Sequence, residues 1–140
     1  MFDSHPQVAA FIGEFEACRL PKERWTHQAH LVAGFWYLSQ QPMPGALDAI
    51  RQRIRSHNDA VGTPNTDSSG YHETITRLYL KGIAAHIAAH QALPFERSLA
   101  ALLASPVAKK EWPLTYYSSQ LLFSTKARRE WVEPDLQPFR

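Results

Sequence analysis

Three histidines at the start of two apolar segments are the residues best suited to chemistry in this chain. His27 and His30 stand three positions apart in W-T-H-Q-A-H-L, and His72 opens a second apolar segment in G-Y-H-E-T-I-T. Side chains three apart are neighbours on a helix, so the first two imidazoles are expected to face the same way. A helix N-terminus disfavours imidazolium, and a neutral ring can donate a lone pair to a metal ion.

These imidazoles predict a site for a divalent transition metal, with Zn, Fe, Ni and Mn all compatible with the ligand type. Glu16 is the carboxylate expected to join them, because an anion in the last turn of a helix opposes the helix dipole and needs a partner. Arg19 is the alternative partner for Glu16, and Asp67 stays open as a further ligand. Three protein ligands would leave room for water or substrate, as in catalytic centres.

The same histidines also have a structural interpretation, in which each ring is a buried polar group bonded to the backbone or to water. The spacing H-x-x-H is common by chance, so the metal hypothesis depends on all three rings facing inward. His86 and His90 lie near a helix C-terminus, where imidazolium is favoured, and are interpreted as structural. His5 and His57 are expected to be solvated.

Glu73 and Tyr116 are the candidate catalytic side chains beside this centre. Glu73 follows the third histidine and is a possible base, although with Gly70 as N-cap it would occupy the capping-box position instead. Tyr116 lies in W-P-L-T-Y-Y-S-S and is expected in the core, with a hydroxyl that could reach a polar centre.

A polar connection from 58 to 70, N-D-A-V-G-T-P-N-T-D-S-S-G, leads directly into the third histidine. We expect it to form one wall of the site, with Asn65, Thr66 and the adjoining Tyr71 as substrate contacts. Asp67 to Gly70 are expected to turn the chain and cap the next helix. A surface connector without function is the alternative.

Helical periodicity along almost the whole chain supplies the elements that must position these residues. It predicts an all-α fold, a single-domain bundle of about five to seven helices over 1–140, with an extended tail at 133–140. The expected helices cover 6–18, 26–40, 45–58, 70–91, 95–104, a short segment broken at Pro113, and 125–132.

Length and composition fit one globular domain. The chain has 140 residues, of which 44% are hydrophobic and 20% charged, and its formal net charge of +2 predicts no nucleic-acid partner. No apolar run reaches the roughly 18 residues of a membrane span, and no secretory signal is visible, so a cytoplasmic protein without membrane contact is expected. The single cysteine, Cys18, shares a stripe with Phe11 and Phe15 and is expected in the core.

The segments F-E-A-C-R-L-P, W-T-H-Q-A-H-L, N-T-D-S-S-G-Y-H-E-T-I-T and Y-Y-S-S-Q-L-L-F-S-T-K-A-R-R-E-W-V-E-P-D-L resemble a group of small uncharacterised bacterial proteins. This resemblance covers most of the chain and implies a single compact domain, but no activity, substrate or cofactor. The architecture also resembles, to a lesser extent, DinB-like metal-binding bundles. Their histidine arrangement differs, so no ligand is carried over from them.

The sequence therefore predicts a metal-dependent enzyme, a hydrolase or an oxidoreductase, that acts on a small molecule. The alternative is a non-catalytic helical module that binds a ligand or a partner and whose histidines are structurally satisfied. In that interpretation the tail E-P-D-L-Q-P-F-R could lie across a neighbouring subunit of a homodimer.

Overall fold

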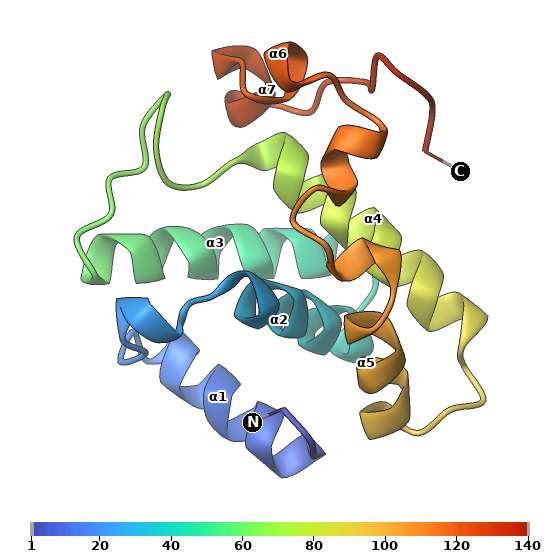
Figure 1. The fold of residues 1–140 in the computed structure, drawn as a ribbon. Coiled ribbons are helices and arrows are strands. Elements are labelled where there is room, and N and C mark those ends of the chain that lie inside the picture. Colours follow the sequence, from blue (N-terminus) through green and yellow to red (C-terminus); the bar gives the residue numbers. More distant parts are fainter. Residues whose placement is uncertain (1, 140) are drawn as a thin grey trace.

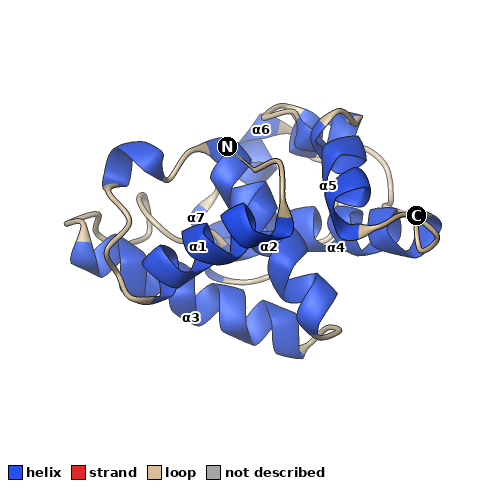
Figure 2. Cartoon of the chain, turned by 90° about the horizontal axis from the view of Figure 1, so that it is seen from below, coloured by secondary structure: helices blue, strands red, loops and turns tan. Residues whose placement is uncertain are grey.

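The structure, a computed structural model, describes residues 2–139, and all regular structure in this range is helical (Figure 2). The main helices are α1 His5–Glu16, α2 His27–Gln40, α3 Gly45–Ala60, α4 Glu73–Ala89 and α5 Phe95–Leu103. Two short helices follow, α6 Ser119–Leu122 and α7 Thr125–Arg129, and 3-10 helices cover Lys22–Arg24, Pro106–Ala108 and Trp112–Thr115. The predicted all-α bundle is confirmed. Within the described residues, no helix combines the length and apolar character that crossing a membrane requires.

Helix α2 lies at the centre of the bundle and contacts α1, α3, α4 and α5 (Figure 1). Its side chains are apolar on nearly every side, and Leu31, Val32 and Phe35 are at most 2% exposed. A helix of this composition is stable only when neighbours enclose it. Gly34 marks the closest approach of α4, since a Cβ built there would stand 2.9 Å from Cδ1 of Ile83.

The start of α2 follows the sequence prediction, whereas the start of α4 does not. Thr26 caps α2 by accepting a hydrogen bond from the Ala29 N–H at 3.1 Å. At α4 the N-cap is His72, whose side chain accepts from the backbone N–H of Ile75. Gly70 is therefore not the cap, and Glu73 is the first residue of the helix rather than its capping-box residue. Both predictions were wrong because a histidine side chain supplies the capping acceptor.

The end of α1 differs from the prediction too. The helix stops at Glu16, and Cys18 is exposed and has a left-handed φ of 58°. The N–H of Cys18 bonds to the carbonyl of Phe15, and that of Arg19 bonds to the carbonyl of Glu14 at 2.9 Å. This is a Schellman ending, which turns the chain away from the helix axis. Cys18 consequently leaves the apolar stripe, and its predicted place in the core is wrong.

The residues from 112 onward pack on α4 and form with it an apolar cluster separate from the main core. Its buried members are Leu78, Trp112, Tyr117, Leu122, Ala127 and Val132. The tail folds back on the same chain: the N–H of Leu136 bonds to the carbonyl of Tyr116 at 2.9 Å, and Phe139 packs edge-on against the Tyr116 ring. Arg140, the last residue of the predicted tail, lies outside the described residues.

Candidate ligand-binding cleft

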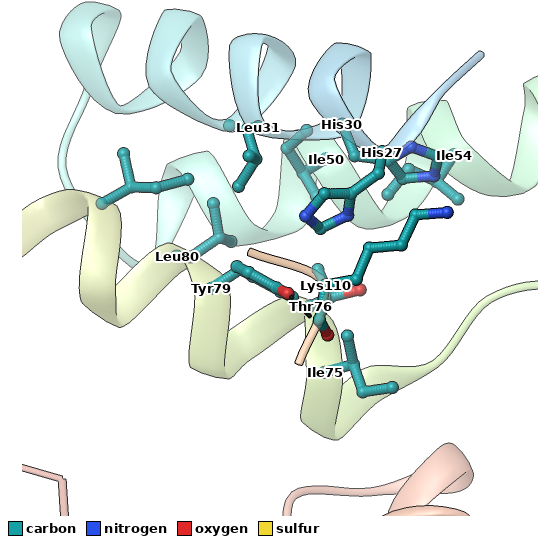
Figure 3. A pocket seen from close by; sticks show the side chains of 12 residues that line it. His27, His30, Leu31, Ile50, Ile54, Ile75, Thr76, Tyr79, Leu80 and Lys110 are labelled. Atoms are coloured by element: carbon teal, nitrogen blue, oxygen red, sulfur yellow. Dashed lines mark hydrogen bonds between the residues drawn. The ribbon is translucent and has the colours of Figure 1, made fainter. Parts of the chain in front are cut away.

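A hollow of about 400 Å³ lies between α2, α3 and α4, and we name it the first hollow (Figure 3). Aliphatic side chains from all three helices form most of its wall: Leu31, Ile50, Ile54, Ile75, Leu80 and Ile83. Its polar lining consists of His27, His30, Thr76, Tyr79 and Lys110. An apolar wall with a few convergent polar groups is the usual composition of a small-molecule site.

A second hollow of about 410 Å³ adjoins the first. The two share four wall residues: His30, Ile54, Ile75 and Thr76. The remaining lining of the second hollow is more polar and comes from the start of α4, the end of α3 and the loop between them: Asn58, Val61, Thr63, Gly70, Tyr71 and His72, with Lys22 and Trp25 opposite. The two hollows therefore adjoin along these four residues, His30 among them, and we name the two together the cleft.

The ring of His30 is held in a defined tautomer. Its Nδ1 lies 2.7 Å from the carbonyl oxygen of Thr26, which can only accept, so Nδ1 carries the proton. Nε2 is left with a lone pair and no partner among the described residues. The ring stacks on Trp25 at 3.9 Å between centroids. Solvent reaches His30 through the hollows. The surrounding protein still desolvates the ring, and this lowers the pKa of His30 to about 4. The side chain is therefore a neutral acceptor at pH 7.

His27 has the opposite tautomer. Its Nε2 lies 3.0 Å from the carbonyl oxygen of Ala108 and must donate to it, which leaves Nδ1 as an acceptor. Burial lowers the pKa of His27, and the nearby ammonium of Lys110 lowers it further. The ring packs edge-on against Tyr79, whose hydroxyl donates to the carbonyl of Lys109 at 2.8 Å. Two neutral imidazoles thus lie beside the first hollow (Figure 3).

His72 lines the second hollow, but both of its ring nitrogens are already hydrogen-bonded. Its Nε2 donates to the carbonyl of Leu122 at 2.7 Å, while Nδ1 accepts from the Ile75 N–H at 3.1 Å. Glu16 lines neither hollow, and its carboxylate accepts from the hydroxyl of Tyr37. Among residues 2–139 no three His, Cys, Asp or Glu side chains form a group able to hold a metal. The expected ligand set therefore does not come together, and a bound transition metal stays a prediction without geometric support.

Glu73, the candidate base, is a buried partner of Arg51. Two guanidinium nitrogens of Arg51 donate to its carboxylate at 3.0 and 2.6 Å, and the Tyr71 hydroxyl donates at 2.7 Å. Burial alone would raise the pKa of Glu73, but the bonds from Arg51 and Tyr71 outweigh it and lower the pKa. The side chain lines neither hollow. It links α3 to the start of α4.

The loop before α4 lines the second hollow through Val61, Thr63 and Gly70 rather than through Asn65 or Thr66. Asn65 is occupied within the loop, where its Oδ1 accepts from Nδ2 of Asn58 and from the N–H of Tyr71. Of the other two predicted contacts, Thr66 is exposed in a turn and Tyr71 lines the second hollow. Asp67, the further candidate metal ligand, pairs with Arg129. Asn65 therefore stabilises the loop instead of facing the second hollow.

Tyr116, the other candidate catalytic residue, lies in the C-terminal cluster against Trp112 and lines neither hollow. His57, which was expected to be solvated, is fully buried and bonds through Nε2 to the carbonyl of Leu20 at 3.0 Å. That expectation was wrong because α3 continues to Ala60 and carries His57 into the core.

His86 and His90 stack on each other at 4.0 Å. Each also donates to a backbone carbonyl, His86 to that of Ser98 and His90 to that of His86. This matches their structural interpretation.

The charged groups of the cleft are of one sign. Its lining residues, all within the described range, include the two lysines Lys22 and Lys110 and no carboxylate. Such a lining favours a neutral or anionic ligand over a cation. Sequence reasoning missed both lysines, since neither belongs to a motif. Tyr79 had a detectable signal, because it shares the inward stripe of Ile75 and Ile83.

A comparison of the chain with protein-family models, curated proteins and solved structures finds no match. No relative's activity therefore bears on the cleft. Its function has to be argued from the shape of the two hollows and from the acceptors that face them.

Proposed function

We propose that this protein binds a small, mainly apolar molecule in the first hollow, through a hydrogen-bond donor directed at Nε2 of His30. The observation that carries the proposal is the lone pair of a neutral imidazole that has no protein partner beside an aliphatic cavity. Water satisfies such an acceptor in the free protein, and a ligand that displaces the water has to replace its hydrogen bond. A ligand without a donor would leave the acceptor unpaired, which costs about 1–3 kcal/mol.

The volume of the first hollow limits the size of the ligand. At about 30 Å³ for each water-sized group, its 400 Å³ hold on the order of a dozen non-hydrogen atoms. This is the size of a substituted phenol or a medium-length alcohol. The volume also lies within the range of roughly 300–1,000 Å³ that is common for ligand pockets.

A pair of probes that differ by one methyl group tests the proposal. Para-propylphenol carries a hydroxyl donor, and para-propylanisole replaces that hydrogen by a methyl group. By calorimetry at pH 7 we expect the phenol to bind at least about tenfold more tightly. The preference should vanish in His30→Phe, which keeps a ring against Trp25 but removes the acceptor. The matched control His90→Phe, at the far end of α4, should keep the preference. Equal binding of both probes to the unmodified protein would refute the proposal.

A metal-dependent enzyme, either a hydrolase or an oxidoreductase acting on a small molecule, is the second candidate. One observation favours it: Nδ1 of His27 and Nε2 of His30 both keep a lone pair beside the first hollow. Against it, the protein would supply two ligands instead of the usual three or more, next to the ammonium of Lys110.

Titration with Zn, Ni, Mn and Fe(II) salts decides this second candidate. Binding that is lost in His27→Phe would support it, whereas no binding up to about 1 mM metal would end it. A cytoplasmic location and a homodimer stay predictions, and light scattering measures the second.

A further inference from the structure

The two hollows differ in chemistry on either side of His30. The first is walled mainly by aliphatic side chains, while the second adds the polar groups of Lys22, Asn58 and Thr63. A molecule long enough to occupy both must therefore have an apolar part and a polar part. His30 would face the bond that joins them, since it belongs to both walls.

The free acceptor of His30, which lies between the two hollows, limits the chemical group that can join the apolar and polar parts of the ligand. Nε2 of His30 needs a donor in the middle of the molecule, at the point where its two parts are joined. Ester and ether links carry no hydrogen to donate, whereas an amide link carries an N–H. The hydroxyl of Thr76, also in both walls, can donate to the amide carbonyl.

The polar end of the molecule is set by the charge of the second hollow. Lys22 is exposed in its 3-10 helix and forms no ion pair with another described residue. No carboxylate lines this hollow to oppose an anion. A carboxylate in the second hollow would therefore gain an ion pair with Lys22 and could accept from the hydroxyl of Thr63.

We infer that the cleft takes an acyl amide with a terminal carboxylate, the composition of an N-acylated amino acid. The acyl chain lies in the first hollow, the amide N–H donates to Nε2 of His30, and the carboxylate lies beside Lys22. This inference rests on the proposed function and adds to it the second hollow, the amide link and the anionic end of the ligand.

Three probes separate these features in calorimetric titrations at pH 7. N-octanoylglycine has all of them, octanoyloxyacetate replaces the amide by an ester, and N-methyloctanamide lacks the carboxylate. We expect N-octanoylglycine to bind at least about tenfold more tightly than the ester, because the ester leaves His30 unpaired. We expect it to bind about three- to fivefold more tightly than N-methyloctanamide, a gain typical of a solvent-exposed ion pair.

Two variants test which residue is responsible for the gain in affinity from the amide and for the gain from the carboxylate. His30→Phe should abolish the preference for amide over ester, and Lys22→Ala should abolish the gain from the carboxylate. Lys126→Ala, which replaces an exposed lysine on α7 that lines neither hollow, should change neither gain.

Equal binding of the amide and the ester to the unmodified protein would overturn the amide assignment, and equal binding of N-octanoylglycine and N-methyloctanamide would overturn the anionic end. In both cases the preference for para-propylphenol over its methyl ether would still stand, and with it the proposed function. Failure of all probes, the phenol included, would remove both.

Discussion

Replacing Glu73 by Gln tests whether the buried carboxylate holds α3 against the start of α4. The Glu73 side chain is 9% exposed and accepts from Arg51 and from the Tyr71 hydroxyl. The amide cannot accept both guanidinium bonds as an anion does, so Arg51 loses its buried counter-charge. Breaking a fully buried ion pair costs about 3–5 kcal/mol. Arg51 is one-third exposed and keeps Asp48 at 3.0 Å, so we expect about 2–3 kcal/mol.

The pH dependence of the same variant gives a second measure. Because the folded-state pKa of Glu73 is lowered, its contribution to stability is present above the unfolded-state pKa of about 4.3. That contribution is lost as the pH falls through the lower folded-state pKa. The difference in free energy of unfolding between the natural chain and Glu73→Gln should therefore be constant near pH 7 and shrink below about pH 4.3.

Urea denaturation followed by circular dichroism measures both effects, and a loss of 2–3 kcal/mol corresponds to a melting temperature lower by roughly 4–12 °C. Glu23→Gln, at an exposed position, is the matched control and should change the free energy of unfolding by less than about 0.5 kcal/mol. A Glu73→Gln protein as stable as the control, or with an unchanged pH profile, would refute the role of Glu73 as a structural ion-pair partner.

Three further substitutions test local features by denaturation. Cys18→Gly should stabilise the protein by about 0.5–1 kcal/mol, because glycine adopts the left-handed φ without strain; a loss of stability would contradict the Schellman ending. His72→Ala should cost about 2–3 kcal/mol, by removing the cap of α4 and the bond to Leu122, and His72→Asn should recover the capping share; equal losses would argue against capping. Tyr117→Phe should cost about 1 kcal/mol through its buried bond to the carbonyl of Val132, and no change would show that bond to be neutral.

The parts of the fold that depend on neighbouring residues could be predicted from the sequence. Thr26 caps α2 through a bond to Ala29, three residues away, and the apolar character of α2 on all sides indicated its central position. The predictions of the end of α1 and the start of α4 were wrong. At the end of α1, Cys18 adopts a backbone conformation that glycine favours, and at the start of α4, His72 replaces the usual capping residue. Both choices depart from local preference, so composition could not indicate them.

The site was predicted only in part, for a physical reason. The inward direction of His27 and His30 follows from helix periodicity, and both line the first hollow. The hydrogen bonds of two of the three rings depend on distant carbonyls: that of Ala108 for His27 and that of Leu122 for His72. No local pattern shows which distant carbonyl an imidazole will meet. In the sequence, His72 therefore looked as suitable a metal ligand as His30, although both of its ring nitrogens are hydrogen-bonded in the structure.

The C-terminal segment of the chain holds the loop that forms one wall of the second hollow. Its loop wall is tied to α7, where Arg128 donates to the carbonyl of Gly70 at 2.8 Å and Arg129 pairs with Asp67. These contacts join residues 58 and 62 positions apart. We therefore expect the wall and the C-terminal segment to belong to one cooperative folding unit. Detachment of that segment would open the second hollow, and the backbone amides of both would exchange with solvent in one event.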